Sequence, residues 1–66
     1  MKLSKRELEI LELISQGYSD KEIAYNLQIS ARTVQTHVTR TVIKLGARNR
    51  PNAVANYMRQ YHMGIA

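Results

Sequence analysis

The motif Ser-x-x-Glu occurs twice near the start of the chain, at Ser4 to Glu7 and at Ser19 to Glu22. This is the spacing of a capping box, in which the serine oxygen accepts a hydrogen bond from the third helical amide and the glutamate accepts one from the serine amide. Each box therefore predicts the start of a helix. Because Gly17 suits the left-handed turn after a helix, we expect the first helix to end just before the second box.

The rest of the sequence contains further residues typical of helix ends. Ser30 is a good cap for a third helix, Gly46 is placed to end it, and Asn49 caps a fourth helix whose first turn tolerates Pro51. No strand pattern, repeat or linker occurs. The sequence therefore predicts an all-α fold in a single domain over residues 1–66, with four helices at about 5–15, 20–27, 31–45 and 50–62.

Charge is distributed unevenly along the chain. The net charge is +5, from ten Lys and Arg against five Asp and Glu, and all five acids lie in residues 1–22. The remaining residues, 23–66, contain bases and no acid. This pattern favours a polyanion such as nucleic acid as partner over a membrane surface. Because there is no cysteine and no apolar run near the roughly 20 residues that span a bilayer, we expect a cytoplasmic protein outside the membrane.

The second and third predicted helices are joined by about three residues, which is too short for an antiparallel return and predicts a helix-turn-helix. With Val34, Val38, Val42 and Leu45 directed inward, the third helix carries Gln35, Thr36 and Thr39 on its free face and Arg32 and Arg40 at the rim. Such a face suits the major groove of DNA, with base edges at its centre and phosphates at its margins. Ser19 and Lys21, in the first turn of the second helix, are further candidates for phosphate contacts.

Five short motifs follow one another along the chain at characteristic spacings: L-S-x-R-E-x-E-I-L at 3–11, G-x-x-x-K-E-I-A-x-x-L at 17–27, S-x-x-T-V-x-T-H-V at 30–38, K-L-G at 44–46 and R-x-x-A-V at 50–54. Together they resemble the LuxR-type (GerE-like) helix-turn-helix domain of bacterial response regulators and quorum-sensing regulators. The resemblance covers about residues 3–54. It implies a four-helix DNA-binding domain.

The resemblance also implies roles for individual positions. Those matching Gln35, Thr36 and Thr39 face base edges, and those matching Thr33, Arg40 and the start of the second helix approach phosphates. Taken together, the predicted phosphate contacts are Ser19, Lys21, Arg32, Thr33, Arg40 and Lys44. In the family the fourth helix forms a two-fold dimer interface on DNA, and the residues available for it here are Val54, Tyr57, Met58 and Tyr61.

The chain departs from the family pattern at three positions. Lysine or arginine is usual where Gln35 stands, so the preferred site shifts toward adenine or the affinity drops. Thr41 replaces a common isoleucine and weakens the inner face of the third helix. Ile43 falls where a basic residue is frequent, which indicates an exposed apolar spot.

The most favoured function is a bacterial transcriptional regulator, or its C-terminal effector domain, that binds specific double-stranded DNA as a homodimer. The two histidines, one aspartate and no cysteine do not form a convincing metal site or catalytic triad, so we expect no enzyme activity, metal or cofactor. Two alternatives stay open. One is a stand-alone protein-binding module that pairs with another LuxR-type regulator through the fourth helix, and the other is a sigma-factor-like promoter-reading domain that binds RNA polymerase.

Overall fold

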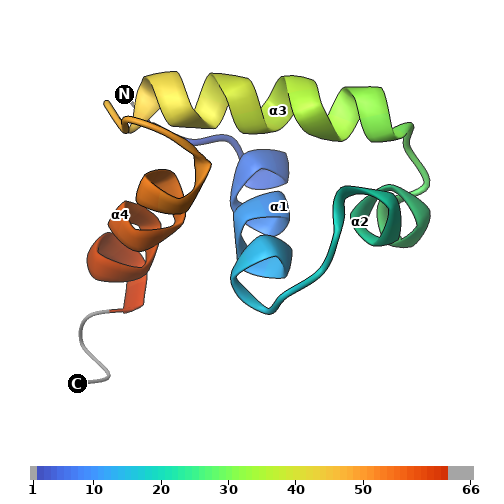
Figure 1. Cartoon of the computed structure of the whole chain (residues 1–66), viewed down its shortest axis with the longest axis horizontal. Helices are drawn as coiled ribbons and strands as arrows, with labels where there is room; N and C mark the ends of the chain where they lie inside the picture. The colour runs from blue at the N-terminus through green and yellow to red at the C-terminus, as the bar shows by residue number, and fades with distance from the viewer. Residues whose placement is uncertain (1, 63–66) are drawn as a thin grey trace.

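The structure is a computed structural model that describes residues 2–62 and the side chains of residues 2–60. Within that range the chain forms four helices and no strand: α1 (Lys5–Ser15), α2 (Asp20–Leu27), α3 (Ala31–Lys44) and α4 (Arg50–His62). The predicted all-α fold is confirmed, and α3 ends one residue earlier than expected because Leu45 is its C-cap. In Figure 1, α3 lies across the top of the molecule and the other helices lie beneath it.

The predicted helix ends are confirmed in atomic detail. The Glu7 amide donates to Ser4 Oγ at 3.1 Å and the Ser4 amide donates to Glu7 Oε1 at 2.8 Å, which completes the first capping box. Ser19 and Glu22 form the second box in the same way. Gly17 has a φ of +97°, in the range that glycine adopts at low cost. These boundaries depend on residues close in sequence, so local patterns suffice to predict them.

The turn between α2 and α3 is formed by residues 28–30. Gln28 adopts the left-handed conformation with a φ of 58°, which is unusual for a residue other than glycine. The Ile29 amide then donates to the Ala24 carbonyl at 3.0 Å, and Ser30 Oγ accepts from the Thr33 amide at 3.0 Å. The chain therefore leaves one helix and enters the next within three residues, as a helix-turn-helix requires.

Two clusters of buried apolar side chains hold the helices together. The first joins α1, α2 and α3 through Ile10, Ile23, Ala24, Val34 and Val38. The second joins the N-terminal segment, α1 and α4 through Leu3, Leu11 and Tyr57. Thr41 lies on the inner face of α3, as the resemblance implied, with only 1% of the residue exposed, and its hydroxyl donates to the His37 carbonyl at 2.8 Å. Its spacing of seven residues from Val34 was the signal for this inward position.

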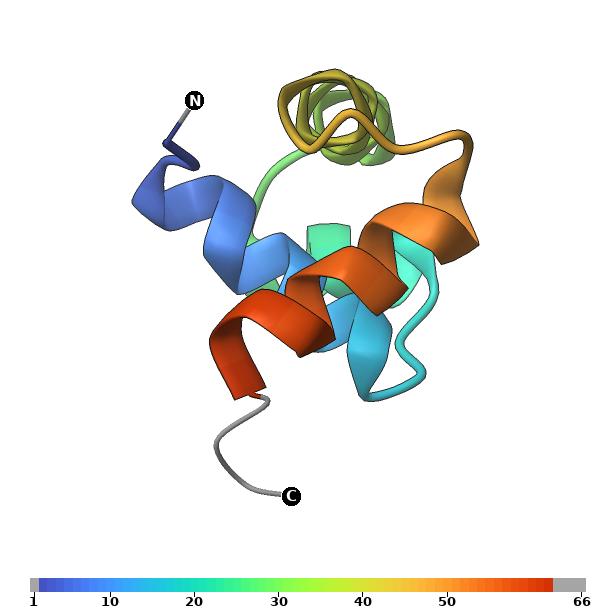
Figure 2. The ribbon, with the colours of Figure 1, turned by 90° about the vertical axis from the view of Figure 1, so that its left-hand side faces the viewer.

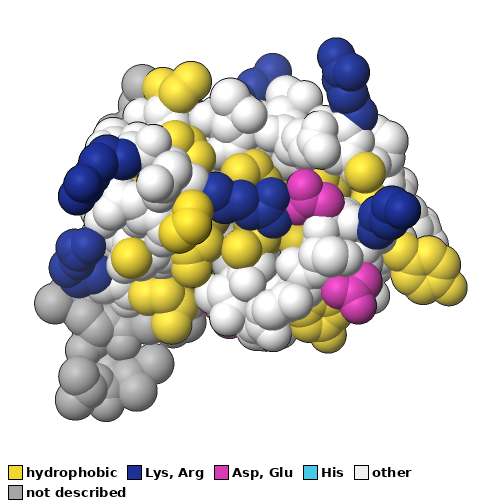
Figure 3. Space-filling view, in the orientation of Figure 1, with side chains coloured by type: hydrophobic (Ala, Val, Ile, Leu, Met, Phe, Trp, Pro, Cys, Tyr) yellow, Lys and Arg dark blue, Asp and Glu magenta, His cyan; other side chains and the backbone are white. Residues whose placement is uncertain are grey.

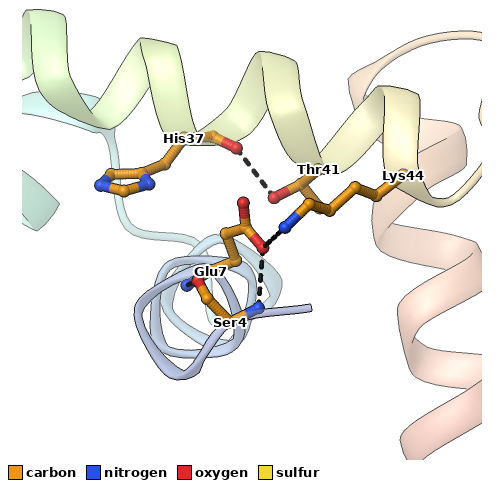
Figure 4. A network of polar contacts seen from close by, with 5 residues as sticks. All are labelled: Ser4, Glu7, His37, Thr41 and Lys44. Carbon is orange, nitrogen blue, oxygen red and sulfur yellow. Dashed lines mark hydrogen bonds and ion pairs between the residues drawn. The ribbon is translucent and has the colours of Figure 1, made fainter. Parts of the chain in front are cut away.

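A buried ion pair fixes α3 to α1. Glu7 is only 3% exposed, and its Oε1 lies 2.9 Å from Lys44 Nζ. Figure 4 shows the Glu7 side chain reaching toward α3 between His37 and Lys44. Burial raises the pKa of Glu7, but the hydrogen bonds from Lys44 and Ser4 and the charge on Lys44 outweigh burial, and the pKa lies below its ordinary value of 4.5. The carboxylate is therefore charged and paired at neutral pH.

Two further polar contacts join segments that are distant in sequence. Arg50 makes two hydrogen bonds with the Asp20 carboxylate, at 2.6 and 3.1 Å, and so ties the start of α4 to the start of α2. The Tyr57 hydroxyl donates to Glu12 Oε1 at 2.5 Å and ties α4 to α1. Together with the Glu7–Lys44 pair, these contacts use three of the five acids of the chain within the fold.

Candidate nucleic-acid interface

One side of α3 is free of the other helices. In Figure 1 and in the view along the α3 axis in Figure 2, α1, α2 and α4 all lie on the same side of α3. The residues that point to the opposite side are exposed along the length of the helix. We call this set the α3 outer face: Arg32, Gln35, Thr36, Thr39, Arg40 and Ile43. It includes every predicted base contact and the two arginines predicted to contact phosphates.

The polar side chains at the centre of the α3 outer face are mostly unused by the fold. Within the described part of the chain, Gln35 and Thr39 have no side-chain hydrogen bond to another residue. Thr36 differs, because its hydroxyl donates to the Arg32 carbonyl at 3.1 Å. In that arrangement the Thr36 oxygen is available mainly as an acceptor, while the Gln35 amide offers both a donor and an acceptor.

The rim of the α3 outer face is cationic. Arg32 and Arg40 are exposed, and among the described residues neither forms an ion pair. Figure 3 shows Lys and Arg side chains rising from the edge where α3 lies, whereas the acidic groups visible in this view lie lower on the molecule. All five acids of the chain lie in α1 and α2. The face thus combines hydrogen-bonding groups with positive charge and has no carboxylate that would repel a polyanion.

The other predicted phosphate contacts lie near the ends of α2 and α3. Ser19 and Lys21 are exposed in the first turn of α2. The Ser19 oxygen already accepts from the Glu22 amide, so the Ser19 hydroxyl would contact a phosphate as a hydrogen-bond donor. Thr33 is half-buried in the first turn of α3, with its hydroxyl oxygen 2.9 Å from Ser30 Oγ. These three contacts stay predictions.

Lys44 does not belong to the α3 outer face, and its predicted contact with phosphate stays a prediction. Its ammonium turns toward α1 and pairs with Glu7 at 2.9 Å, and its side chain is 26% exposed. A carboxylate buried in the protein needs a counter-charge more than an exposed phosphate does, because little water is present to solvate it. This pairing could not be predicted from short-range patterns, since the two residues are 37 positions apart.

The predicted dimer residues on α4 have different environments. Tyr57 is only 5% exposed and packs in the second core cluster, so little of its side chain is available to a dimer interface, and its predicted place there stays a prediction. Val54 is half-buried against the same cluster, while Met58 is 42% exposed. The side chain of Tyr61 lies outside the described residues. Near Met58 on the outward side of α4, Pro51 and Ala55 are also exposed, and together these three residues form a small apolar patch.

Other parts of the surface suit nucleic acid less well. A groove of about 380 Å³ between α1 and α2 is bordered by Glu9 and Glu12, whose charges oppose phosphate. His37 is half-buried, and among the described residues its Nδ1 is a buried side-chain atom without a hydrogen-bond partner. The described residues contain no group of three or more His, Cys, Asp or Glu that could hold a metal ion. None of the described helices is long and apolar enough to cross a membrane.

Comparison with known proteins gives a consistent set of matches. Residues 1–57 match the family described as bacterial regulatory proteins, luxR family. Over 52 residues, or 79% of the chain, the sequence is 54% identical to the oxygen regulatory protein NreC of Staphylococcus aureus (strain JH9). The chain spans 24% of the length of that relative.

Two solved structures are similar in fold and in sequence. The response regulator ChrA of a heme-sensing two-component system matches 91% of this chain with 30% of its own, at a TM-score of 0.84 and 42% identity. The transcription factor GerE matches 88% of this chain with 87% of its own, at a TM-score of 0.84 and 40% identity. The four-helix arrangement predicted from the sequence is therefore the arrangement of GerE.

Proposed function

This chain belongs to the luxR family of bacterial regulatory proteins, which are DNA-binding transcription regulators and generally not enzymes, and we propose that it binds a specific double-stranded DNA site through the α3 outer face. On this proposal α3 lies in the major groove and two copies are joined through α4. Such a regulator acts in the cytoplasm, where bacterial DNA lies. The observation that supports the proposal most strongly is the composition of the α3 outer face, which is exposed, cationic at its rim and free of acids.

The groups on the α3 outer face suggest how each of them contacts DNA. Gln35 has an unused amide that can pair with N6 and N7 of adenine in the major groove. Thr36 presents its oxygen as an acceptor, which favours the exocyclic amino group of adenine or cytosine. Arg32 and Arg40 stand at the margins, where phosphates line the groove. We therefore assign base reading to the centre of the face and positioning to its rim.

Selection of bound duplexes from a random pool tests this function directly. We expect enrichment of a palindrome whose half-sites are about one helical turn apart, with a steep dependence of affinity on salt. A pool that yields no enriched sequence would contradict the proposal and favour the protein-binding alternative. Burial of Tyr57 weakens that alternative, because it removes one tyrosine from the α4 surface that a partner regulator was expected to contact.

Substitution of Gln35 by alanine should relax the sequence preference at one base step. A good bidentate contact supplies about 1–3 kcal/mol of discrimination between bases, so the preference for adenine there should fall by that amount. For each half-site position, the measurement is a titration of the four operators that carry A, C, G or T at that position. The matched control is Gln60→Ala, which removes the same amide from an exposed position on α4. If the preference at every position is unchanged in Gln35→Ala, Gln35 does not read a base.

Substitution of Met58 by glutamate should weaken the pairing of two copies on DNA. Met58 is exposed in the small apolar patch with Pro51 and Ala55, and a carboxylate there would be desolvated in an apolar interface. We expect roughly tenfold weaker binding to an operator with two half-sites, at about 1.4 kcal/mol for each tenfold change, and unchanged binding to one half-site. Titration of both duplexes measures this.

Gln60→Glu provides the control for that substitution. It adds the same charge to an exposed position on α4, about 200° around the helix from Met58. Cooperative binding should be much less affected in Gln60→Glu. Equal losses in the two variants, or a loss confined to half-site binding, would show that the patch around Met58 is not the dimer contact.

A further inference from the structure

Ile43 is an exposed apolar side chain on a face that is otherwise polar. Its side chain is 68% exposed, compared with 0% for Val34 and 8% for Val38 on the opposite side of the same helix. It lies in the last turn of α3, beyond the residues proposed to read bases. Among the described residues, neither buried cluster includes its side chain or packs against it. Its apolar surface is therefore available to any partner that covers the α3 outer face.

The position of Ile43 on the helix aligns it with the proposed base-reading residues. At about 100° per residue, Thr36, Thr39 and Ile43 lie within roughly 60° of one another around the helix axis. Along the axis, Thr36 to Ile43 spans about 10.5 Å at 1.5 Å per residue, close to three base steps of about 3.4 Å. Ile43 thus extends the row of Thr36 and Thr39 by one turn, with Arg40 at its side.

The chemistry of this position differs from that of a phosphate contact. An isoleucine cannot donate a hydrogen bond or neutralise charge, and the apolar group in the major groove is the C5-methyl of thymine. Contact between these two apolar groups removes both from water and gains free energy in proportion to the area that they bury. We propose that Ile43 contacts a thymine methyl group in each half-site and makes thymine the preferred base there. This inference rests on the proposed function, because it requires α3 to lie in the major groove.

The surroundings of Ile43 favour DNA over a protein as its partner. The other residues of the α3 outer face are polar or cationic, so a protein docking on Ile43 would have to cover Thr39 and Arg40 as well. A single isoleucine is also a small apolar area for a protein interface, whose core is usually built from several large side chains. In the major groove, in contrast, one methyl contact among hydrogen bonds is an ordinary way to read thymine.

Deoxyuridine provides a direct test, because it is thymidine without the C5-methyl group. We would take the operator selected by the full chain, replace each thymine of one half-site in turn by deoxyuridine, and titrate wild type and Ile43→Ala with every duplex. Burying one methyl group corresponds to an affinity change of about fourfold. At one position we expect deoxyuridine to weaken wild-type binding by that factor and to leave Ile43→Ala almost unaffected. Circular dichroism would verify that the variant is folded.

Two further variants make the result specific. Thr39→Ser removes a methyl group one turn away from Ile43. Replacing the thymine assigned to Ile43 by deoxyuridine should weaken the binding of Thr39→Ser by the same factor as the binding of wild type. Ile43→Lys should lose the response and gain a phosphate contact, which steepens the slope of log affinity against log salt by about 0.9.

The outcomes separate this inference from the proposed function. Specific binding in which no thymine shows a response that depends on Ile43 would overturn the methyl contact and leave the proposed function standing. Failure of the full chain to select any operator would instead overturn both. A response that is lost in Thr39→Ser and kept in Ile43→Ala would assign the methyl contact to Thr39 and also overturn the inference.

Discussion

Substitution of Lys44 by methionine is expected to destabilise the domain by about 2–3 kcal/mol. Breaking a fully buried ion pair costs roughly 3–5 kcal/mol, and the expected loss is smaller here because the Lys44 side chain is 26% exposed. The variant leaves the Glu7 carboxylate in a site that is only 3% exposed, without its counter-charge. Methionine preserves most of the length of the lysine stem, so packing changes little. Urea unfolding monitored by circular dichroism measures the difference. For a chain of 66 residues this loss is a large part of the expected stability.

The dependence on pH separates the lost charge pair from a general packing defect. Because the folded-state pKa of Glu7 lies below 4.5, the pair stabilises the wild type fully above that pH and loses this contribution as pH falls through the folded-state pKa. Without Lys44, the buried Glu7 of the variant takes up a proton at a higher pH than Glu7 of wild type, so the stability gap between the two proteins should narrow as the pH falls. Glu22, whose pKa is also lowered by hydrogen bonds from Ser19, is present in both proteins and does not affect this difference.

Two controls complete the experiment on Lys44. Lys21→Met removes a charge from an exposed position and should change stability by less than about 0.5 kcal/mol. Glu7→Gln combined with Lys44→Met should recover much of the loss, since the glutamine oxygen can still accept from the Ser4 amide while no unpaired charge remains. If Lys44→Met is as stable as wild type and instead shows a shallower salt dependence on DNA, then Lys44 contacts phosphate as the sequence suggested.

The features that the sequence predicted well are those that depend on neighbouring residues. Ser4, Ser19 and Ser30 cap helices because the amides that they accept from lie three positions later in the chain. The exposed side of α3 could be predicted for the same reason, since helical periodicity separates Gln35 and Thr39 from Val34 and Val38. Local structure and the direction of each face therefore followed from short-range patterns.

The contacts that could not be predicted are those in which the partner of a side chain is far away in the sequence. Lys44, a predicted phosphate contact in the last turn of α3, pairs with Glu7, which lies 37 positions away in the sequence. Tyr57, a predicted dimer contact on α4, donates its hydroxyl to Glu12, which lies 45 positions away in the sequence. A single sequence does not show which charged or aromatic residue satisfies a buried group, because tertiary packing decides the pairing. The candidate base contacts do not raise this problem, because within the described residues Gln35 and Thr39 have no side-chain hydrogen bond and Thr36 bonds to the Arg32 carbonyl only four positions earlier.

Removal of both rim arginines, Arg32→Ala with Arg40→Ala, should have the largest effect on DNA binding. Each phosphate contact contributes about 0.9 to the slope of log affinity against log salt, so the double variant should lose about 1.8 from that slope. At 0.1 M salt this corresponds to roughly tenfold weaker binding for each arginine. Since phosphates carry no base identity, the loss should be similar for the selected operator and for unrelated duplexes. Titration of both duplexes at several salt concentrations measures slope and selectivity together.

Lys5→Ala with Arg59→Ala is the matched control for that pair. It lowers the net charge of the chain by the same two units at exposed positions on α1 and α4, away from the α3 outer face. If binding depends on contacts made by Arg32 and Arg40, the control should retain most of the affinity and most of the salt slope. Equal losses in the two double variants would mean that the total charge, and not the rim of α3, attracts DNA. A loss confined to the selected operator would mean that one of the arginines reads a base, most directly guanine through O6 and N7.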